Sequence, residues 1–326
     1  MRGSLESVPR LIGRRLVAIA LTSIAVTAVV FGLAAASPFD PLAYRLGSQY
    51  GKFTPGELEQ LRSAAGFDKP WWQQLLSWWG GLLRGDAGFS HLYNKPVADV
   101  MAERVPWTLV LSGAGLIIAL VGAVGLGIWA AWQPEGLVAK TISFLGVALA
   151  ATPTFVYALG IIVVFGTLLH LIPLGGAAPP GTVPTLGGMG PYLIAPAFVL
   201  GLSQLPWPLL AMEEASRSAW NSPAVEAAQL RGLSRWQVLV GHVLPMSVLP
   251  MVTVFGTRLG ELVVGAVIIE SVFSWPGLAQ ATVESALAVD FSLLAVITVA
   301  TTVLVMVGSL MSDVAYLVLD PRVSDV

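Results

Sequence analysis

Seventy-two consecutive residues, from Thr141 to Met212, contain no Asp, Glu, Lys or Arg. This run is much longer than the roughly 20 apolar residues that cross a bilayer once. Its middle part, Pro173–Pro191, holds eleven glycines and prolines among nineteen residues, and these residues interrupt helices. The sequence therefore predicts two membrane helices here, at about 142–169 and 192–212, and Pro153 predicts a kink in the first of them.

Four other apolar stretches satisfy the same length criterion: Leu16–Ala36, Val105–Pro134, about 246–269 and Phe291–Ser312. The whole chain is 56% apolar and 11% charged, whereas soluble domains carry about 25% charged residues. We therefore expect an all-α polytopic membrane protein with six transmembrane helices. The first span is followed at once by Pro38 and Asp40, which favours a retained helix over a removable signal peptide.

Composition also excludes several classes of function. The chain has no cysteine, which rules out disulfide scaffolds, thiolate metal sites and thiol catalysis. Its net charge of −2 leaves no basic tract for nucleic acid. The three histidines, at positions 91, 170 and 242, are too far apart in sequence to form a metal-ligand motif. We accordingly expect no catalytic residues, no metal and no cofactor in this chain.

The distribution of basic residues predicts the orientation. Four arginines precede the first span, and the 213–245 segment carries three more, whereas the loops at 173–190 and 271–290 have no Lys or Arg. Basic residues concentrate in short cytoplasmic loops, so both termini are expected in the cytoplasm. The 37–104 segment, with seven basic and seven acidic residues, is then outside; loops of about this length translocate largely regardless of charge.

The 37–104 segment, which we call the cap, contains one strongly amphipathic helix. Asp68 and Pro70 are helix-start signals, and the apolar residues that follow recur on one helical face. These residues are Trp71, Trp72, Leu75, Leu76, Trp79, Leu82 and Leu83. Such a helix either lies on the membrane surface or packs against the outer ends of the spans.

The segment 222–245 predicts two short helices joined at a glycine. Ser222 is a good N-cap before Pro223, and Gly232 is placed to end the first helix. Ser234 with Gln237 forms a capping box that starts a second helix, which Pro245 is expected to end. A simple loop between spans would not need this pattern, so we interpret it as a rigid docking element.

At these residues the chain resembles the permease subunits of ABC importers. Glu226, Ala227 and Ala228, followed by Gly232 and then Leu244 and Pro245, have the spacing of their EAA motif. We therefore name residues 222–245 the EAA segment. Further motifs in the cap and in the last third of the chain, such as Glu270–Leu278, resemble the B-type subunit of dipeptide and oligopeptide importers. Pro223-Ala224 and Pro245-Met246 depart from the usual residues of that branch, which bears on which ATPase is matched.

The resemblance implies a type I ABC importer permease fold and a division of labour. A second, C-type permease completes the pore, two ATPase subunits that hold ATP and Mg dock on the EAA segment, and an extracytoplasmic solute-binding protein delivers the solute. The bacterial inner membrane is the expected location. The implied organisation is residues 1–36 for the cytoplasmic N-terminus and first helix, 37–104 for the cap, 105–316 for the permease domain and 317–326 for a cytoplasmic tail. The single Gly-Lys pair, Gly51-Lys52, is not part of a P-loop, so ATP hydrolysis must come from a partner.

Three ionisable residues are candidates for the solute path. Arg258 and Glu261, three residues apart within a span, either face the pore or form a structural ion pair, which could also lie near the inner interface. Glu270, near the expected outer mouth, either contacts the solute or the binding protein or caps the turn at Ser271.

Four functions compete at this stage. The first is import of di- and oligopeptides. The second is the same machinery with another cargo, such as nickel, an oligosaccharide or an opine. A secondary transporter would show inverted repeats, which we do not find, and would need no docking helices. A membrane-embedded enzyme would need a catalytic constellation in its spans, and Arg258 with Glu261 does not supply one.

The orientation predicts a labelling pattern. Because the chain has no cysteine, single cysteines can be introduced and exposed to a membrane-impermeant thiol reagent in intact cells. Cysteines in the cap and in the 173–190 loop should react. A cysteine at Gln229 should stay unlabelled, and its labelling would overturn the orientation.

Overall fold

The computed structural model describes residues 2–38 and 40–319, with the backbone alone described at 2–11, 41, 44–45, 65, 257, 259–264 and 311–319. The 317–326 tail therefore lies largely outside the described residues. The chain divides into two compact units. The first contains 109–275 with the two chain ends, up to 13 and from 305, and the second contains 14–108 and 276–304. Three long helices, α1 (Arg2–Ala36), α5 (Val97–Trp132) and α15 (Phe291–Leu319), contribute residues to both units.

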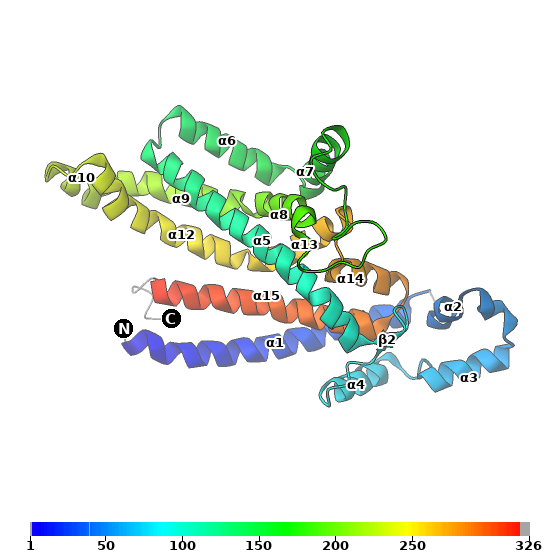
Figure 1. Cartoon of the computed structure of the whole chain (residues 1–326). Coiled ribbons are helices and arrows are strands. Elements are labelled where there is room, and N and C mark those ends of the chain that lie inside the picture. Colours follow the sequence, from blue (N-terminus) through cyan, green and yellow to red (C-terminus); the bar gives the residue numbers. More distant parts are fainter. Residues whose placement is uncertain (1, 39, 320–326) are drawn as a thin grey trace. The chain divides into compact units, whose positions relative to one another are not determined.

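The first unit is a helical assembly (Figure 1). Its helices, besides part of α5, are α6 (Leu137–Ala151), α7 (Thr154–Ile161), α8 (Gly190–Gln204), α9 (Pro206–Trp220), α10 (Pro223–Leu230), α11 (Arg235–Val238), α12 (Leu244–Thr257) and α13 (Leu259–Val272), with π-helical turns η2 (Ile162–Leu168) and η3 (Leu239–Val243). Helix α9 lies between α6 and α12 and packs against both. Their shared core includes Ile142, Leu209, Met212 and Met251. Gly127 allows the close approach of α9 to α5, because a Cβ there would overlap the sulfur of Met212 and displace that side chain.

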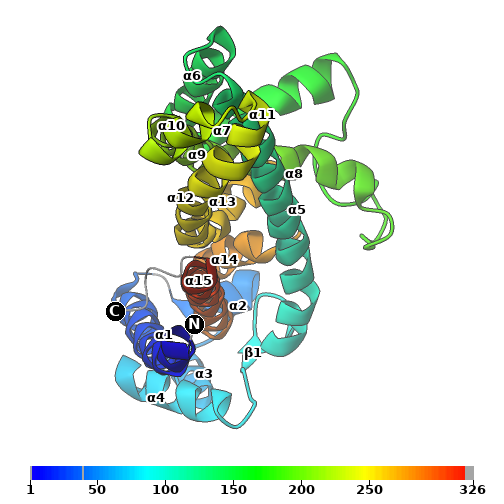
Figure 2. The ribbon, with the colours of Figure 1, turned by 90° about the vertical axis from the view of Figure 1, so that its left-hand side faces the viewer.

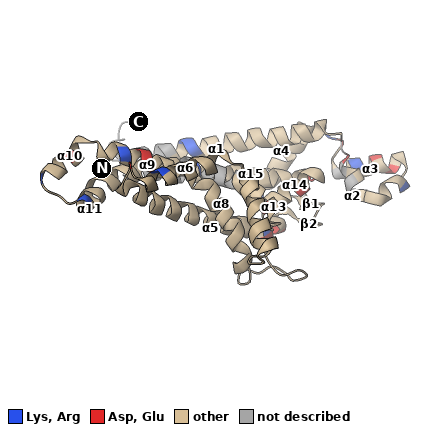
Figure 3. Ribbon diagram, turned by 90° about the horizontal axis from the view of Figure 1, so that it is seen from above, with Lys and Arg blue, Asp and Glu red and all other residues tan. Residues whose placement is uncertain are grey.

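The prediction of a helical protein with several membrane-spanning helices is confirmed. Among the residues that the structure describes, four helices are long and apolar enough to cross a bilayer: Ile12–Ala36, Val97–Trp132, Arg235–Gly256 and Phe291–Leu310. Two bent pairs raise the number to six if each pair is one span: Leu137–Ala151 with Thr154–Leu168, and Gly190–Gln204 with Pro206–Trp220. Figure 3 shows these helices uncharged over most of their length, with charged residues visible on α3, α9 and α11.

Two span predictions need correction. The stretch 142–169 is not a merely kinked helix, because α6 and α7 differ in direction by 103° at the break before Pro153. Proline cannot donate the backbone hydrogen bond that would continue α6, and it disfavours helical backbone at the preceding residue. The predicted fifth span, 246–269, is also wrong. The helix that is long and apolar enough to cross a bilayer begins eleven residues earlier, at Arg235, and the helical backbone is interrupted at Arg258 before α13 begins.

The second unit combines the cap with the neighbouring parts of α1 (Arg2–Ala36), α5 and α15 and with α14 (Leu278–Leu287). The cap contains α2 (Pro41–Leu46), the 3-10 helix η1 (Gly47–Lys52), α3 (Pro55–Ala65), α4 (Trp71–Leu82) and a hairpin of β1 (Phe89–Ser90) and β2 (Lys95–Pro96). Helix α4 matches the predicted amphipathic helix. Its Leu75 and Trp78 are buried against Phe31 of α1 and Ala295 of α15, whereas Trp72 and Leu76 are 51% and 69% exposed.

The hairpin is held by two carboxylates that lie about 200 residues away in sequence. Asp290, almost fully buried, accepts hydrogen bonds from the Ser90 hydroxyl at 2.7 Å and from the Leu92 amide at 3.1 Å. Glu284 accepts one from the Tyr93 hydroxyl at 2.5 Å. The strands themselves are only two residues long, so these side-chain bonds fix the hairpin against α14 and the start of α15.

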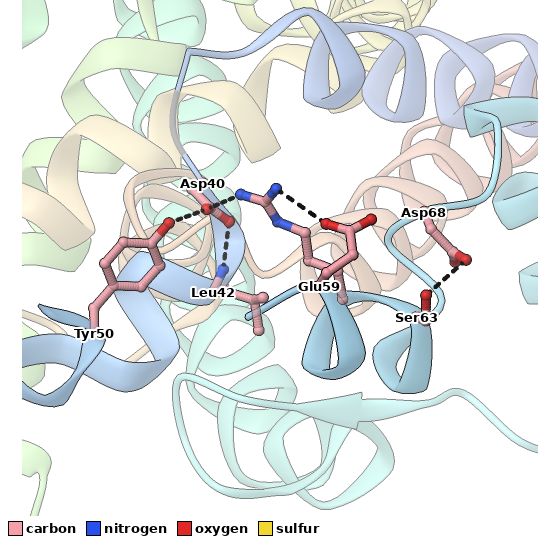
Figure 4. Close-up of polar contacts among 7 residues, drawn as sticks. Asp40, Leu42, Tyr50, Glu59, Ser63 and Asp68 are labelled. Atoms are coloured by element: carbon pink, nitrogen blue, oxygen red, sulfur yellow. Dashed lines mark hydrogen bonds and ion pairs between the residues drawn. The ribbon is translucent and has the colours of Figure 1, made fainter. Parts of the chain in front are cut away.

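Asp40 joins three parts of the cap (Figure 4). One of its oxygens accepts from the Leu42 amide at 3.0 Å and caps α2, and the other accepts from Tyr50 at 2.7 Å and Arg62 at 2.5 Å. Partial burial alone would raise the pKa of Asp40. The hydrogen bonds from Tyr50, Arg62 and Leu42 and the Arg62 charge outweigh it and hold that pKa below its usual value of 3.8.

This network predicts an acid-sensitive cap. Because the pKa of Asp40 is lower in the folded than in the unfolded chain, its contribution to stability is present above about pH 4 and is lost as the pH falls through the folded value. Asp40→Asn should lower the opening free energy of α2 and α3 at pH 7 by about 1–2 kcal/mol and weaken its acid dependence, of which Glu57 in the α3 capping box keeps a part. Hydrogen exchange of these helices between pH 7 and pH 3 measures both effects. Asp68→Asn, which affects one exposed bond to Ser63, is the control, and equal effects of the two variants would contradict the assignment.

Candidate functional site

The first helix of the EAA segment begins and ends as its sequence predicts. The Ser222 hydroxyl accepts a hydrogen bond from the Val225 amide at 3.4 Å, and Pro223 is the first residue of α10. Ser222 therefore caps a helix that runs to Leu230, with Glu226 in its first turn. A carboxylate at that place is favoured by the helix dipole.

Gly232 makes the corner between α10 and α11. Its φ is +82°, in the left-handed region where residues with a Cβ are strained, and a Cβ built there would meet no atom within 4 Å. After the corner, the Ser234 and Gln237 side chains each bond the other's backbone amide, which is the predicted capping box. The corner is thus set by backbone conformation rather than by contact with neighbouring side chains.

The prediction that Pro245 ends the second helix is wrong. Helical backbone continues from α11 through η3 into α12, and Pro245 is in the first turn of α12. In η3 the bonding pattern widens, so that the Leu244 amide donates to the Leu239 carbonyl five residues back. Pro245 has no backbone N–H to donate. Because it directly follows the π turn, where the backbone hydrogen bonds change from π-helical to α-helical spacing, the missing bond does not end the helix.

The inner side of the EAA segment is fixed to the end of α5. Val225, Ala228 and Val238 are fully buried in a cluster with Trp132 and Trp220. Trp220 donates its indole N–H to the Ala131 carbonyl at 2.7 Å. Arg235 donates to the Trp132 carbonyl at 2.7 and 3.0 Å. These carbonyls belong to the last turn of α5, where no helical partner exists, so Arg235 and Trp220 cap α5.

The outer side of the segment is open. Glu226 and Ala227 are exposed, as are two large apolar side chains, Leu230 at 83% and Trp236 at 58%. We call these four residues the docking face; Figure 2 shows the helices that carry them, α10 and α11, lying close together. Of the predicted coupling residues, Ala228 is buried beneath this face, Leu244 is half-buried, and Pro245 is exposed beside a shallow apolar pocket next to Val248.

A second feature of the first unit is a cavity of about 530 Å³ where helix breaks meet. Thr152–Thr154 at the α6–α7 break, Gln204 and Trp207 beside the α8–α9 break, and Arg258 at the α12–α13 break all line it. Backbone interrupted at membrane depth is tolerated where it is buried in protein or lines a water-filled cavity. The cavity is therefore a place where these interrupted helices can be accommodated within the first unit.

The three predicted path residues have different settings. Arg258 lines the cavity, with its guanidinium carbon 3.8 Å from the centre of the Trp207 ring. Glu261 is in α13, but its side chain lies outside the described residues, so its pairing with Arg258 stays a prediction. Glu270 is completely buried within the first unit, and its carbonyl accepts from the Trp275 amide at 2.8 Å. An arginine in a membrane segment costs about 2.5–3.5 kcal/mol on insertion scales, which makes Arg258 a functional candidate.

Sequence reasoning missed Arg235, Trp132 and Trp220 at the docking end, and Trp207 and Gln204 in the cavity. The Arg235–Trp132 hydrogen bond joins residues 103 positions apart, so no local sequence pattern predicts it. The cluster of tryptophans at 132, 220 and 236 around the EAA motif is the one signal that pointed to this end of the chain.

Comparison with known proteins gives the family. The model of the binding-protein-dependent transport system inner membrane component matches residues 123–325, and that of the N-terminal part of such membrane components matches 8–112. The chain belongs to this family. This permease therefore has the type I importer fold and is a multi-pass inner membrane protein that works in a complex with other subunits.

Individual relatives agree over nearly the full length. The permease is 30% identical to the oligopeptide transport system permease protein AppB of Bacillus subtilis, over 99% of this chain and 98% of the relative. It is 31% identical to a putative peptide permease protein of Brucella suis, over 92% and 94%. It is 32% identical to the dipeptide transport system permease protein DppB of Lactococcus lactis, over 83% and 87%.

The corner predicts a separation between folding and coupling. Gly232→Val places a β-branched residue at φ +82°, which costs roughly 1–2 kcal/mol, although its Cβ meets no atom within 4 Å. We expect normal insertion and at least a fivefold loss of transport per ATP hydrolysed in reconstituted vesicles. Gly241→Val, also with open space at its Cβ but without a positive φ, is the matched control. Fully coupled transport by Gly232→Val would contradict a coupling role for the corner.

Proposed function

We propose that this permease forms one half of the pore of an ATP-driven peptide importer, as its B-type subunit. A second permease of the C type would complete the pore. Two cytoplasmic ATPases would dock on the EAA segment and supply all ATP and Mg chemistry, and an extracytoplasmic binding protein would deliver the peptide. Both termini would then be cytoplasmic.

The docking face is the observation that carries this proposal. It presents exposed apolar and acidic side chains on a corner that is capped at both helix starts and bonded to the end of α5. Large exposed apolar side chains on a rigid support are typical of a protein interface. A partner that moves this corner would also move α5, α9 and the helix that continues into α12.

Peptides are the cargo best supported by the relatives. All three described above carry peptide, oligopeptide or dipeptide transport in their names. The same machinery with nickel, an oligosaccharide or an opine as cargo is the alternative. A secondary transporter has no use for a docking face of this kind.

The test is reconstitution of the complex purified through a tag on this chain. A second permease and two P-loop ATPases should co-purify, and vesicles should take up a radiolabelled tripeptide only with ATP and the binding protein. Glu226→Lys reverses the charge of the docking face and should lower ATPase co-purification and peptide uptake together, at least fivefold. Glu59→Lys, on the exposed face of the cap, should lower neither. Uptake of nickel without peptide would replace the cargo, and uptake independent of ATP would overturn the proposal.

A further inference from the structure

Helix α4 of the cap has an apolar face that is exposed. Trp72, Leu76 and Leu83 are 51%, 69% and 83% exposed. Leu76 follows Trp72 by four residues and Leu83, the C-cap of the helix, follows Leu76 by seven, so the three side chains lie on one helical face. We call these three residues the exposed stripe. Large apolar side chains gathered on an exposed face mark a contact with a protein or with a membrane.

The other two faces of α4 have different surroundings. Leu75 and Trp78 are buried against α1 and α15. On a further side, Gln74 lines a pocket of about 420 Å³ together with the charged residues Lys69 and Asp86. The helix itself, from Trp71 to Leu82, carries no charged side chain. A helix with one polar face and one exposed face of Trp and Leu is typical of the boundary between membrane and water.

Helix α4 lies beside α1 and not beyond its end (Figure 1). The Trp79 indole N–H donates to the Thr27 hydroxyl of α1 at 3.1 Å. The apolar span of α1 runs from Ile12 to Ala36. A hydrocarbon core of about 30 Å that starts at Ile12 reaches about 8 Å past Thr27. Helices that lie in the membrane interface are buried by about 5–10 Å, so Trp79 is at the depth expected of one.

The surface of α1 on which α4 packs is an apolar ridge. Its members, spaced four and three residues apart in turn, are Val17, Leu21, Ile24, Ala28 and Phe31. Ala28 and Phe31 pack with the buried side of α4. Val17, Leu21 and Ile24 are exposed, and exposed apolar side chains on a membrane-spanning helix are suited to contact with lipid. Helix α4 therefore covers the end of a ridge whose remaining part is suited to the bilayer.

The charged residues that follow α4 are compatible with this position. Arg84 comes directly after Leu83 and is exposed. Its long apolar stem allows the guanidinium group to reach the lipid headgroups while the helix lies deeper. Asp86 accepts a hydrogen bond from the Gly88 amide at 2.9 Å and belongs to the polar pocket, away from the buried face of α4.

We propose that α4 lies in the membrane interface on the cap side, with the exposed stripe against lipid. The cap is then attached to the bilayer along α1 and does not stand free in water. The inference does not depend on which solute the complex transports. The competing occupants of the exposed stripe are the second permease and the extracytoplasmic binding protein.

The test measures what surrounds the exposed stripe. Because the chain has no cysteine, Leu76→Cys can carry a single nitroxide spin label in the complete complex, reconstituted in vesicles without the binding protein. The complex with the unaltered chain gives the background from the other subunits. Collision rates are measured with oxygen, which concentrates in lipid, and with a water-soluble nickel chelate. Ser77→Cys is the matched control, because Ser77 is exposed on the side of α4 that lines the polar pocket.

We expect the ratio of oxygen to nickel collision rates to be at least threefold higher at Leu76→Cys than at Ser77→Cys. Leu83→Cys, at the other end of the exposed stripe, should give the same result as Leu76→Cys. Equal ratios at positions 76 and 77 would overturn the inference, because the exposed stripe would then face water and be free for the binding protein. A label at position 76 that is shielded from both reagents would also overturn it, because the second permease would then cover the exposed stripe. Peptide uptake by the same vesicles with the binding protein restored tests the proposed function separately, since either result can be obtained without the other.

Discussion

One continuous stretch of helical backbone, from Arg235 to Thr257, joins the docking end of the chain, on which the proposed function rests, to the cavity at the helix breaks. It begins at the capping box beside the Gly232 corner and ends where Arg258 enters the cavity. In a bilayer the backbone must satisfy its own hydrogen bonds, so a helix is a suitable rigid connection between a surface outside the bilayer and a site inside it. The π turn before Pro245 keeps that connection unbroken despite a proline.

The neighbours of this helix reinforce it at both ends. At the docking end, Arg235 and Trp220 bond the last carbonyls of α5, so that α5, α9 and α11 meet in one cluster. Along its length, α12 packs on α9, with Met251 buried against Leu209 and Met212. A displacement of α11 can reach the cavity without an intervening loop, because helical backbone is continuous from Arg235 to Thr257.

The cap is held together by different interactions. It has short helices and a hairpin with two-residue strands, and side-chain carboxylates bond these parts to one another. Asp40 collects bonds from α2, η1 and α3, while Asp290 and Glu284 hold the hairpin. Helix α4 buries Trp78 against α1 and α15, which agrees with packing on neighbouring helices, and that it also lies on the membrane surface stays a prediction.

Local signals in the sequence predicted local structure well. The caps at Ser222 and Ser234 and the glycine corner depend on neighbours within three residues, and all three are confirmed. Pro153 marked the break between α6 and α7. The 103° angle between these two helices depends on how each of them packs, which the local sequence does not show. Pro245 was wrongly predicted to end a helix, because the π turn that accommodates it could not be predicted from the sequence. The cavity could not be predicted from the sequence, since residues at 152, 204 and 258 come together only through packing of three helix pairs.

The central claim is that the docking face and the cavity are mechanically one piece, and a thiol reaction rate tests it most directly. Ser203→Cys lines the cavity, and its reaction with a hydrophilic reagent can be compared in the nucleotide-free complex and in the complex trapped with ATP and vanadate. The account predicts a rate that changes at least threefold on trapping and that no longer changes when Gly232→Val is added. A rate at position 203 that is the same in both states, in a complex that hydrolyses ATP normally, would contradict it.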